Sequence, residues 1–534
     1  MSAPGSYLAK LKANRNAQVP PAAPAAAAVA PGASSVAPTI PPAGAPPSLF
    51  SVQADGSRTC VERVQEALDA IAARNGEINA CVEVLGEAAL KQAAEGDARL
   101  AGGAERRPLE GVPFLVKVNI DVAGSLSTAS MPGLADHRPE STAGSVQRVI
   151  EAGGIVIAKT NMPEAAVGAW GFSPVHGMTT NPVNPKHTTA GSSSGTAAGI
   201  KAHMAVIGLG SDTGGSLRMP AECCGVVGMR PSRGRYPSDG VVPCDVMWDT
   251  VGPMARTVAD LAILDAVMAG ESVADSKQPA SLNEIGVCFA SDLYDSAAPG
   301  ACAARDLVLA AFAAGGADCK KEGVAFKAAA SAIKHETHLH WREKGFDDYI
   351  ASHPNLTKTT EEIAVKSYYA PVLKTWFTVV NGQVNVKSLP AEEVDAAIAK
   401  FEGEREAMTA AYAQMFEDND VEIIVTPVID GVPRKAFTKE EHENLENMGN
   451  VFGTMSMLLG SSASCHLYNN ISVPSLALPT KALHVLVEEG EAAGPAAESG
   501  SAGQMTASVC LWGKPGCDKK LIQVAMALEL AMQK

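Results

Sequence analysis

A Gly/Ser-rich segment between residues 188 and 228 holds the residues whose types and spacing best suit chemistry. Within it, Thr213-Gly214-Gly215-Ser216 is able to form a tight turn whose backbone N–H groups converge on one point, because glycine has no Cβ to obstruct a substrate carbonyl. Donors fixed where negative charge develops each supply about 3 to 4 kcal/mol of transition-state stabilisation. The turn therefore suits an oxyanion hole beside a nucleophile, Ser216, and a plain flexible turn is the alternative.

Two other interpretations of this segment need neighbouring elements that the sequence does not predict. Residues 191–195 match the G-x-S-x-G pattern that makes Ser193 the nucleophile of an α/β-hydrolase, but a proline-punctuated loop stands where a strand is needed. The Gly208-x-Gly210 pair suggests a dinucleotide fingerprint, yet Pro220 interrupts the helix on which a pyrophosphate would sit. A P-loop motif is absent from the sequence.

A serine nucleophile needs a base, and the histidines offer none with an evident carboxylate partner. His335, His338 and His340 cluster in a polar helical stretch that is typical of a solvated helix face. His176 and His187 lie nearer the Gly/Ser-rich segment, but neither has an obvious acidic neighbour.

Lys117 is the other candidate base, because it interrupts the apolar run from Val112 to Val118, where an unpaired charge is costly. Desolvation disfavours the ammonium form, so a buried lysine is able to replace histidine. At an ordinary pKa of about 10.4 only about one lysine in 2,500 is neutral at pH 7, so a large shift or a relay is needed. The alternative is an edge-strand lysine whose stem packs and whose ammonium reaches water.

Helical and strand patterns alternate from about Arg58 onwards, which predicts an α/β sheet with helical covers. The apolar periodicity predicts helices at residues 60–74, 87–100, 141–152, 257–269 and 391–416, the fourth with Thr257 as its N-cap. Apolar, β-branched runs predict strands at residues 111–120, 155–159 and 421–426. No internal repeat interrupts this pattern.

Several of these motifs together resemble the amidase signature family, over a stretch from about Arg58 to the C-terminus. The three main ones are GVPFLVKVNID at residues 111–121, AGSSSG at 190–195 and GLGSDTGGSLRMPA at 208–221. Flanking matches are KTNMPEAAVG at 159–168, GPMARTVADLAILD at 252–265, VTP at 425–427 and WGKPGCDKKLIQVAMALE at 512–529. The resemblance implies a large mixed, twisted sheet covered by helices on both faces.

The resemblance also implies a triad in which Lys117 is the base, Ser192 follows a cis peptide bond and relays the proton, and Ser216 is the nucleophile. The intervals between these three positions are those expected of the family. This chain departs from the family at Ser194, where a glycine is common, which puts the local conformation of that loop in question. The implied oxyanion hole consists of the backbone N–H groups of Thr213, Gly214, Gly215 and Ser216.

Residues around the triad have expected supporting roles. Ser193 is expected to hydrogen-bond within its loop, and Asp212 and Arg218 to brace the nucleophile loop as a charged pair. A purely structural role for these three residues is the alternative. By resemblance the acyl pocket is lined by Ala166, Val167, Trp170 and Phe172, a pattern that core packing explains as well. The mechanism needs no metal and no cofactor.

Composition limits the partners and the compartment. The chain of 534 residues has 46% apolar and 19% charged residues, which suits a large folded domain, and its net charge of −15 argues against a nucleic-acid partner. Eleven cysteines without C-x-x-C favour a reducing compartment, the cytoplasm, and no apolar run is long enough to span a membrane. Residues 1–57 are an Ala/Pro-rich tail or an organelle transit segment, which would place the protein in a stroma or matrix. Residues 488–504 suit a mobile loop within the amidase domain, residues 58–534.

The expected substrate is a small carboxylic amide. Residues 230–262 look closest to the indoleacetamide and mandelamide hydrolases, which favours an aryl or alkyl amide. The alternative is the A-type subunit of a glutamyl-tRNA amidotransferase, which shares the triad and needs partner subunits, ATP and tRNA. A homodimer stays open as an oligomeric state.

Overall fold

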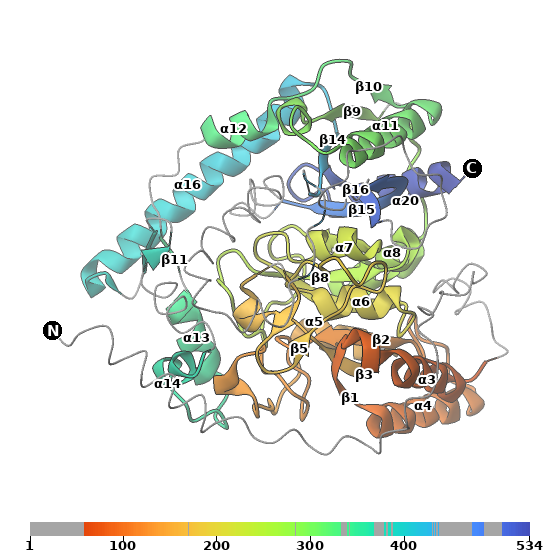
Figure 1. Cartoon of the computed structure of the whole chain (residues 1–534), viewed down its shortest axis with the longest axis vertical. Helices are drawn as coiled ribbons and strands as arrows, with labels where there is room; N and C mark the ends of the chain where they lie inside the picture. Colours follow the sequence, from red (N-terminus) through yellow and green to blue (C-terminus); the bar gives the residue numbers. More distant parts are fainter. Residues whose placement is uncertain are drawn as a thin grey trace. The chain divides into compact units, whose positions relative to one another are not determined.

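The computed structural model describes residues 58–533 with several gaps, and Figure 1 shows its elements. The gaps are residues 169, 284, 333–338, 341, 368–378, 381–382, 386–387, 430, 432, 434–435, 437–472 and 485–504. The tail predicted at residues 1–57, the loop predicted at 488–504, and His335 and His338 therefore lie outside the described residues.

One 11-stranded sheet dominates the fold, with the strand order β1-β3-β2-β6-β8-β7-β15-β16-β14-β9-β10. Its strands are β1 (Cys81–Val84), β2 (Pro113–Lys117), β3 (Ile155–Thr160), β6 (Ile207–Asp212), β7 (Val227–Arg230), β8 (Thr250–Ala255), β9 (Gly286–Phe289), β10 (Asp318–Cys319), β14 (Ile423–Pro427), β15 (Ser475–His484) and β16 (Met505–Trp512). The sheet is mixed, because β2 pairs in parallel with both β3 and β6, whereas β8 pairs antiparallel with β6 and β7.

Helices cover both faces of this sheet, which confirms the predicted α/β class. The alternation along β2 separates the faces, since Leu115 packs in one apolar cluster while Phe114 and Val116 pack in another. The first cluster involves α3 (Cys60–Ile78), α4 (Gly86–Ala101), α6 (Ser194–Lys201), α7 (Arg218–Cys224), α10 (Ser291–Tyr294), α12 (Phe326–Ala332) and α16 (Ala391–Asp418). The second involves α5 (Gly144–Glu151), α8 (Val258–Ala269), α11 (Pro299–Ala314) and α20 (Asp518–Gln533).

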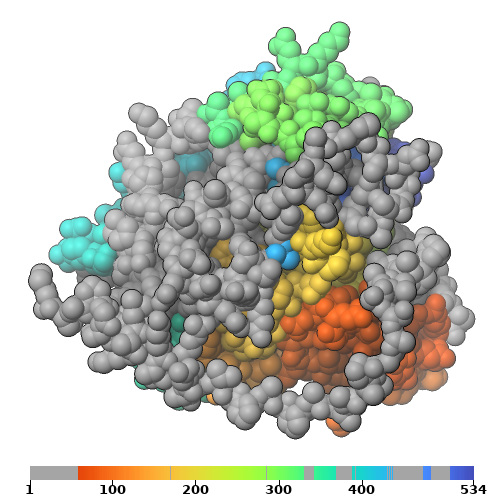
Figure 2. Space-filling view, viewed as in Figure 1, coloured from red at the N-terminus to blue at the C-terminus, as the bar shows by residue number. Residues whose placement is uncertain are grey.

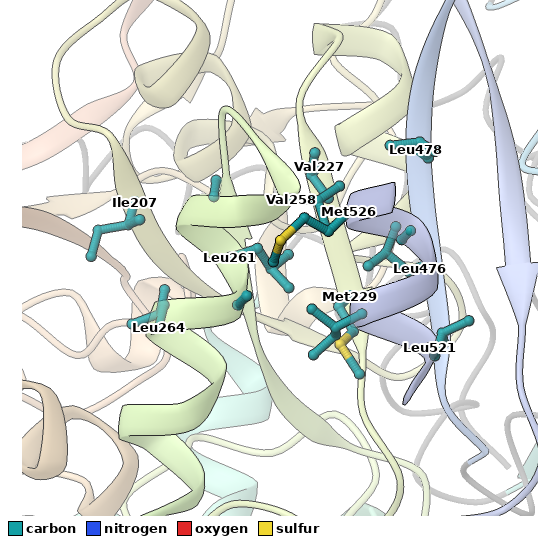
Figure 3. Close-up of a cluster of buried hydrophobic side chains, with 14 of the residues drawn as sticks. Ile207, Val227, Met229, Val258, Leu261, Leu264, Leu476, Leu478, Leu521 and Met526 are labelled. Atoms are coloured by element: carbon teal, nitrogen blue, oxygen red, sulfur yellow. The ribbon is translucent and has the colours of Figure 1, made fainter. Parts of the chain in front are cut away.

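The second cluster joins segments that are far apart in the sequence. Figure 3 shows Leu261 of α8 and Met526 of α20 among side chains from β7 and β15. These buried apolar residues each contribute roughly 1.5 to 3 kcal/mol through removal of their side chains from water. The packing therefore anchors the C-terminal helix to the strands that flank the Gly/Ser-rich segment.

The first cluster brings the N-terminal helices to the same segment. Figures 1 and 2 show the red elements from α3 onwards beside the yellow segment that contains α6, and the two helices are in contact. Helix α6 is closely packed at Gly195, where a Cβ would lie 2.4 Å from the carbonyl oxygen of Ala80. A larger residue at that position would force the loop before α6 away from the sheet.

The predicted element boundaries agree well where the sequence carries a cap. Helix α3 starts with a capping box between Thr59 and Glu62, and α8 starts at the predicted N-cap, Thr257, whose side chain accepts from the N–H of Asp260. Two predictions were too long. The strand predicted at 111–120 is only Pro113–Lys117, and the helix predicted at 141–152 begins at Gly144, whose N–H donates to Asp239.

The remaining elements are short. They are η1 (Pro132–Leu134), η2 (Glu164–Ala166), α9 (Val273–Ser276), α13 (Arg342–Ala351), α14 (Thr360–Val365), the pair β4 (Phe172–Ser173) and β5 (Gly177–Met178), and a sheet of β11 (Leu339–His340), β13 (Gln383–Asn385) and β12 (Val379–Val380). Within the described part of the chain, every helix is too short or too polar to cross a membrane.

Candidate active site

Lys117 ends β2, an inner strand, so the edge-strand interpretation of this lysine is wrong. Its side chain is 0% exposed, and its Nζ lies 2.7 Å from Oγ of Ser192 and 2.9 Å from Oγ of Ser211. Burial lowers the pKa of Lys117 to about 7, although nearby Cys244, Asp212 and Asp249 partly oppose the shift. A substantial fraction of this amine is therefore neutral near pH 7.

Ser192 lies in the loop before α6 and follows a cis peptide bond from Gly191, as the resemblance implied. Its side chain is buried against Lys117. The next residue, Ser193, differs from its prediction, because its hydroxyl bonds across to β6 and not within its own loop. The Oγ of Ser193 donates to the carbonyl of Ser211 at 3.1 Å and accepts from the N–H of Ser211 at 3.3 Å. Ser193 thus fixes the serine loop to the strand beside Lys117.

The nucleophile loop is joined to the same serine loop through its backbone. The N–H of Ser193 donates to the carbonyl of Ser216 at 3.1 Å, which holds the two loops together. Ser216 itself is buried, at 6% exposure, and lies one residue before Leu217, the N-cap of α7. Among the described residues no hydrogen bond joins the hydroxyls of Ser192 and Ser216. The structure thus shows the Lys117–Ser192 contact of the expected triad. Ser216 is connected to this contact through the backbone hydrogen bond from Ser193.

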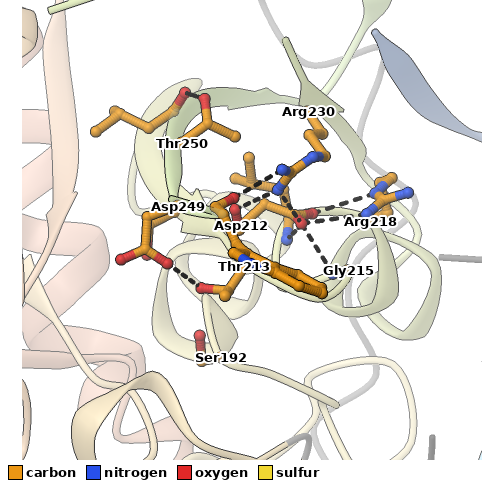
Figure 4. A network of polar contacts seen from close by, with 12 residues as sticks. Ser192, Asp212, Thr213, Gly215, Arg218, Arg230, Asp249 and Thr250 are labelled. Carbon is orange, nitrogen blue, oxygen red and sulfur yellow. Dashed lines mark hydrogen bonds and ion pairs between the residues drawn. The ribbon is translucent and has the colours of Figure 1, made fainter. Parts of the chain in front are cut away.

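Asp212 and Arg218 form the predicted charged pair, with Nη2 of Arg218 3.1 Å from the carboxylate. A second guanidinium, that of Arg230, also contacts Asp212 at 3.0 Å, and all three side chains are buried (Figure 4). Burial alone raises the pKa of the Asp212 carboxyl, but Arg218 and Arg230 hold that pKa well below its ordinary range. The carboxylate is therefore ionised at neutral pH.

The Asp212 carboxylate also shapes the candidate oxyanion loop. It accepts from the N–H of Gly215 at 2.8 Å and from that of Leu217 at 3.1 Å. Gly215 has φ = +109°, a conformation that glycine adopts without steric cost. Because the Gly215 amide already donates to Asp212, the amides of Thr213, Gly214 and Ser216 remain as the candidate oxyanion donors in this structure.

A second carboxylate, Asp249, borders the loop from the other side. The hydroxyl of Thr213 donates to Oδ1 of Asp249, as Figure 4 shows. Burial raises the pKa of Asp249 to about 6, while the hydrogen bond from Thr213 opposes that shift. The loop from Thr213 to Ser216 is thus held between two buried carboxylates.

The four residues expected to line an acyl pocket lie together. Ala166, Val167 and Trp170 belong to one buried apolar cluster, and Phe172 packs against it. Phe346 and Tyr349 of α13 belong to the same cluster. The loop before η1 contributes as well, because Ala129 packs in the cluster and accepts from the N–H of Ala165 at 2.9 Å.

The imidazoles of His176 and His187 bond groups other than Ser192 and Ser216. Nε2 of His176 bonds Oγ1 of Thr128 at 3.2 Å, and burial lowers the pKa of this imidazole to about 4. Nδ1 of His187 bonds the carbonyl of Pro433 at 2.8 Å. His340 is part of β11. Within the described residues no group of His, Cys, Asp and Glu side chains could hold a metal ion.

The other two interpretations of the Gly/Ser-rich segment also lack support in the fold. Residues 181–190 form a loop and not the strand that a nucleophile elbow requires. A helix does follow β6, contrary to expectation, because Pro220 occupies the first turn of α7, where a missing N–H costs little. That helix begins only after the five-residue loop 213–217, so the dinucleotide pattern is not reproduced.

Four residues in this site were missed from the sequence: Ser211, Asn119, Arg230 and Asp249. Ser211 contacts the lysine, and Nδ2 of Asn119 donates to Oγ of Ser211 at 3.2 Å. Arg230 is the second partner of Asp212. Ser211 carried a usable signal, because it lies at the end of the strand after which the nucleophile loop begins. Arg230 lies beyond the loop, and only the pairing of β7 with β8 brings it close.

Comparison with known proteins gives a consistent result. Residues 62–300 match the protein-family model described as Amidase. The A-type subunit of the glutamyl-tRNA(Gln) amidotransferase of Lachnospira eligens is 37% identical over 240 residues, which cover 45% of this chain and 49% of that protein. The mandelamide hydrolase of Pseudomonas putida is 41% identical over 199 residues, covering 36% and 39%. The chain thus spans about half or less of the length of the curated relatives it matches.

Solved structures share the fold over a longer stretch. A structure described as an amidase has a TM-score of 0.66 at 25% identity and covers 91% of this chain and 100% of its own. The native peptide amidase from Stenotrophomonas maltophilia has a TM-score of 0.68 at 22% identity, with 92% and 97% covered. The second likeness shows the fold alone.

Proposed function

We propose that this chain, which belongs to the amidase signature family, hydrolyses a small carboxylic amide to an acid and ammonia or an amine through a seryl acyl-enzyme. One observation carries the proposal: the amine of Lys117 is fully buried and lies 2.7 Å from Oγ of Ser192. A buried lysine with a pKa of about 7 is a suitable general base near neutral pH.

In the first half-reaction neutral Lys117 accepts the hydroxyl proton of Ser192, and Ser192 accepts that of Ser216. Oγ of Ser216 attacks the carbonyl carbon, and the resulting oxyanion accepts hydrogen bonds from amides of the loop that starts at Thr213. The relay returns the proton to the leaving nitrogen as the C–N bond breaks. The acyl group remains on Ser216, and ammonia or an amine departs.

In the second half-reaction water replaces the amine. The relay takes one proton from water, and the water oxygen attacks the acyl carbon. The bond between this carbon and Oγ of Ser216 then breaks, and Oγ of Ser216 takes the proton back from the relay. Hydrolysis thus needs no group beyond the side chains and amides described above. The acid leaves, and Lys117 is neutral again.

We assign the acyl side of the substrate to the cluster that contains Ala166, Val167 and Trp170. Small residues beside aromatic ones suit a compact apolar acid, such as an arylacetic or mandelic acid. Similarity to a mandelamide hydrolase supports this substrate class.

A panel of amides tests the proposal. Indoleacetamide, phenylacetamide, mandelamide and a fatty amide are each incubated with the full chain, and both the ammonia and the acid are quantified. The expected result is release of both products in equal amounts for at least one aryl amide, and loss of this release in Ser216→Ala and Lys117→Ala. Mass spectrometry should show the acyl group on Ser216. Full activity in Ser216→Ala would overturn the assignment of the nucleophile.

The second candidate is the amidotransferase subunit, which releases ammonia from glutamine for transfer to glutamyl-tRNA. It is favoured by the similarity to the A-type subunit of glutamyl-tRNA(Gln) amidotransferase. The net charge of −15 opposes direct contact with tRNA. Failure with every amide of the panel, together with glutamine hydrolysis only when partner subunits are added, would replace the first proposal by this one.

A further inference from the structure

The strand register places Asp249 opposite the first residue of the candidate oxyanion loop. Strands β6 and β8 are antiparallel, and their last paired positions are Asp212 and Thr250. One residue beyond that pair, Thr213 follows the end of β6 and Asp249 precedes the start of β8. The Thr213 hydroxyl donates to Oδ1 of Asp249, so the cross-strand pairing continues through side chains after the ladder ends.

The other carboxylate oxygen of Asp249 holds a turn. Oδ2 accepts from the N–H of Cys244 at 2.8 Å and from that of Asp245 at 3.0 Å. One carboxylate therefore joins the turn 244–249 to the loop that carries Ser216. A buried carboxylate that keeps three donors satisfied is a rigid connection, because losing any partner leaves an unsatisfied polar group.

The two ends of the oxyanion loop are fixed by different carboxylates. Asp212 accepts hydrogen bonds from Gly215 and Leu217 near the nucleophile. Of the residues of the oxyanion loop, Asp249 bonds Thr213. Thr213 and Gly214 are half-buried, whereas Gly215 and Ser216 are buried, so this end of the loop is the more accessible one. The Asp249 contact is the charge-assisted hydrogen bond at the Thr213 end, where the thiol of Cys244 from the same turn also meets the Thr213 side chain.

We propose that Asp249 is a positioning residue of the amidase site, which through the Thr213 hydroxyl aims the amides of Thr213 and Gly214 at the developing oxyanion. The assignment rests on the proposed function. Asp249 does not touch the substrate. Its loss therefore lowers the rate of acyl transfer while substrate binding is nearly unchanged.

The charge of Asp249 adds a second, separable effect on Lys117. The carboxylate favours the ammonium form of this lysine, and so do Cys244 and Asp212. The other groups that face Asp249 are Asp245 of its own turn, Thr213 of the loop, Arg230 of β7 and Arg342 of α13. Removing the charge of Asp249 thus lowers the pKa of Lys117, whereas removing the Thr213 hydroxyl keeps the carboxyl group and only raises its pKa, so this charge is lost in part.

Four variants separate these effects: Asp249→Asn, Thr213→Val, Thr213→Ser and the double variant of the first two. The asparagine oxygen still accepts from the turn amides, but its NH2 group replaces the oxygen that accepts from Thr213, so the Thr213 hydroxyl is left with a weaker, uncharged hydrogen bond of the opposite direction. We expect kcat to fall about tenfold to a hundredfold in Asp249→Asn and in Thr213→Val, with KM within about threefold of wild type. The double variant should be no slower than either single one, and Thr213→Ser should keep most of the activity.

The pH profile is the readout that a merely structural role would not move. The acid limb of kcat/KM should shift to lower pH in Asp249→Asn and move less in Thr213→Val, which keeps the carboxyl group but raises its pKa. Asp239→Asn is the matched control, because the exposed Asp239 also accepts a backbone N–H, that of Gly144, outside the site. It should behave like wild type in every assay.

A covalent probe makes the test independent of the substrate. A fluorophosphonate forms a bond from Oγ of Ser216 to phosphorus and expels fluoride, while the proton goes to the relay, and its phosphoryl oxygen occupies the oxyanion position. We expect slower labelling of Ser216 in Asp249→Asn and in Thr213→Val. If wild type is labelled but hydrolyses no amide, the proposed function fails and the positioning role is still measured.

Either of two results would overturn the inference. One is wild-type labelling and turnover in Thr213→Val, a variant in which Asp249 itself is unchanged. The other is a double variant whose loss equals the product of the two single losses, because independent effects multiply.

Discussion

The Nζ atom of Lys117 lies 2.7 Å from Oγ of Ser192, and both side chains are buried. This contact is productive only when the amine is neutral, because an ammonium has no lone pair with which to accept the serine proton. Burial lowers the pKa of Lys117 to about 7, so the neutral fraction grows as the pH rises through that value.

We therefore expect kcat/KM to increase with pH, with a midpoint near pH 7. A pH series from 5 to 9, in buffers of constant ionic strength, measures the profile for the best substrate of the panel. The rate of Ser216 labelling should follow the same curve. A rate that is constant over this range would exclude Lys117 as the titrating base.

Replacing the lysine by an apolar side chain of similar length should stabilise the fold while it abolishes turnover. The pKa of Lys117 is about 7 in the folded state and about 10.4 when unfolded, so the folded chain binds fewer protons between these values. The free energy of unfolding is thus highest above the unfolded pKa of about 10.4 and decreases as the pH falls from there to the folded pKa of about 7. We expect Lys117→Met to raise the free energy of unfolding at pH 7 by roughly 1 to 4 kcal/mol.

Urea denaturation at pH 7 and pH 9 measures this change, which should be smaller at the higher pH. Lys344→Met is the control, because Lys344 is exposed and its ion pair with Asp348 contributes little. A Lys117→Met protein that is less stable than wild type at pH 7 would show that the polar contacts of the amine outweigh the cost of its burial.

Ser211 should affect the lysine directly. Its hydroxyl lies 2.9 Å from Nζ of Lys117 and accepts from Asn119 as well. Deleting the hydroxyl removes an acceptor that favours the ammonium form, so the acid limb of the pH profile should move to lower pH in Ser211→Ala. We also expect kcat to fall about fivefold to tenfold, because the amine loses one of the contacts that orient it.

The comparison variant is Ser194→Ala, whose hydroxyl makes only a 3.4 Å contact with the carbonyl of Asn161. It should keep the wild-type midpoint and most of the rate. Equal effects of Ser211→Ala and Ser194→Ala would mean that general disturbance of the packing, and not loss of the contact with Lys117, lowers the rate.

The sequence predicted the parts of this site that depend on local chemistry. Lys117 was identified because a charge within an apolar run has few explanations, and the Asp212–Arg218 pair because its members lie six residues apart, on either side of the nucleophile loop. Helix starts were accurate where a cap was present, as at Thr257.

What the sequence could not predict depends on strand order. Asp249 meets Thr213 only because β8 lies beside β6 in a particular register, and Arg230 reaches Asp212 only because β7 follows β8 in the sheet. No pattern within one segment carries that information. The edge-strand interpretation of Lys117 could be excluded only when β2 was found between β3 and β6.

A second buried polar cluster, centred on Asp121, should make the free energy of unfolding depend on pH. Nε2 of His353 lies 2.9 Å from the carboxylate of Asp121, which also accepts from the hydroxyl of Tyr349 at 2.9 Å. The hydrogen bond from His353 to Asp121 raises the pKa of this imidazole above its ordinary value. His137 packs on the same ring, but burial lowers its pKa, so its contribution has the opposite sign.

Because the folded pKa of His353 is raised, its stabilising effect is complete below the unfolded pKa of about 6.5 and is lost as the pH rises through the folded pKa. His353→Gln should therefore destabilise the protein more at pH 6 than at pH 8.5, by about 1 kcal/mol. His137 offsets part of this loss, because without the charge of His353 its pKa is lowered less. Chemical denaturation of wild type and variant at the two pH values measures this difference. His203→Gln is the control, since burial and Arg256 lower the pKa of His203, and its substitution should not cost more at the lower pH. An identical loss at both pH values in His353→Gln would mean that the neutral imidazole, and not its ion pair with Asp121, supports the cluster.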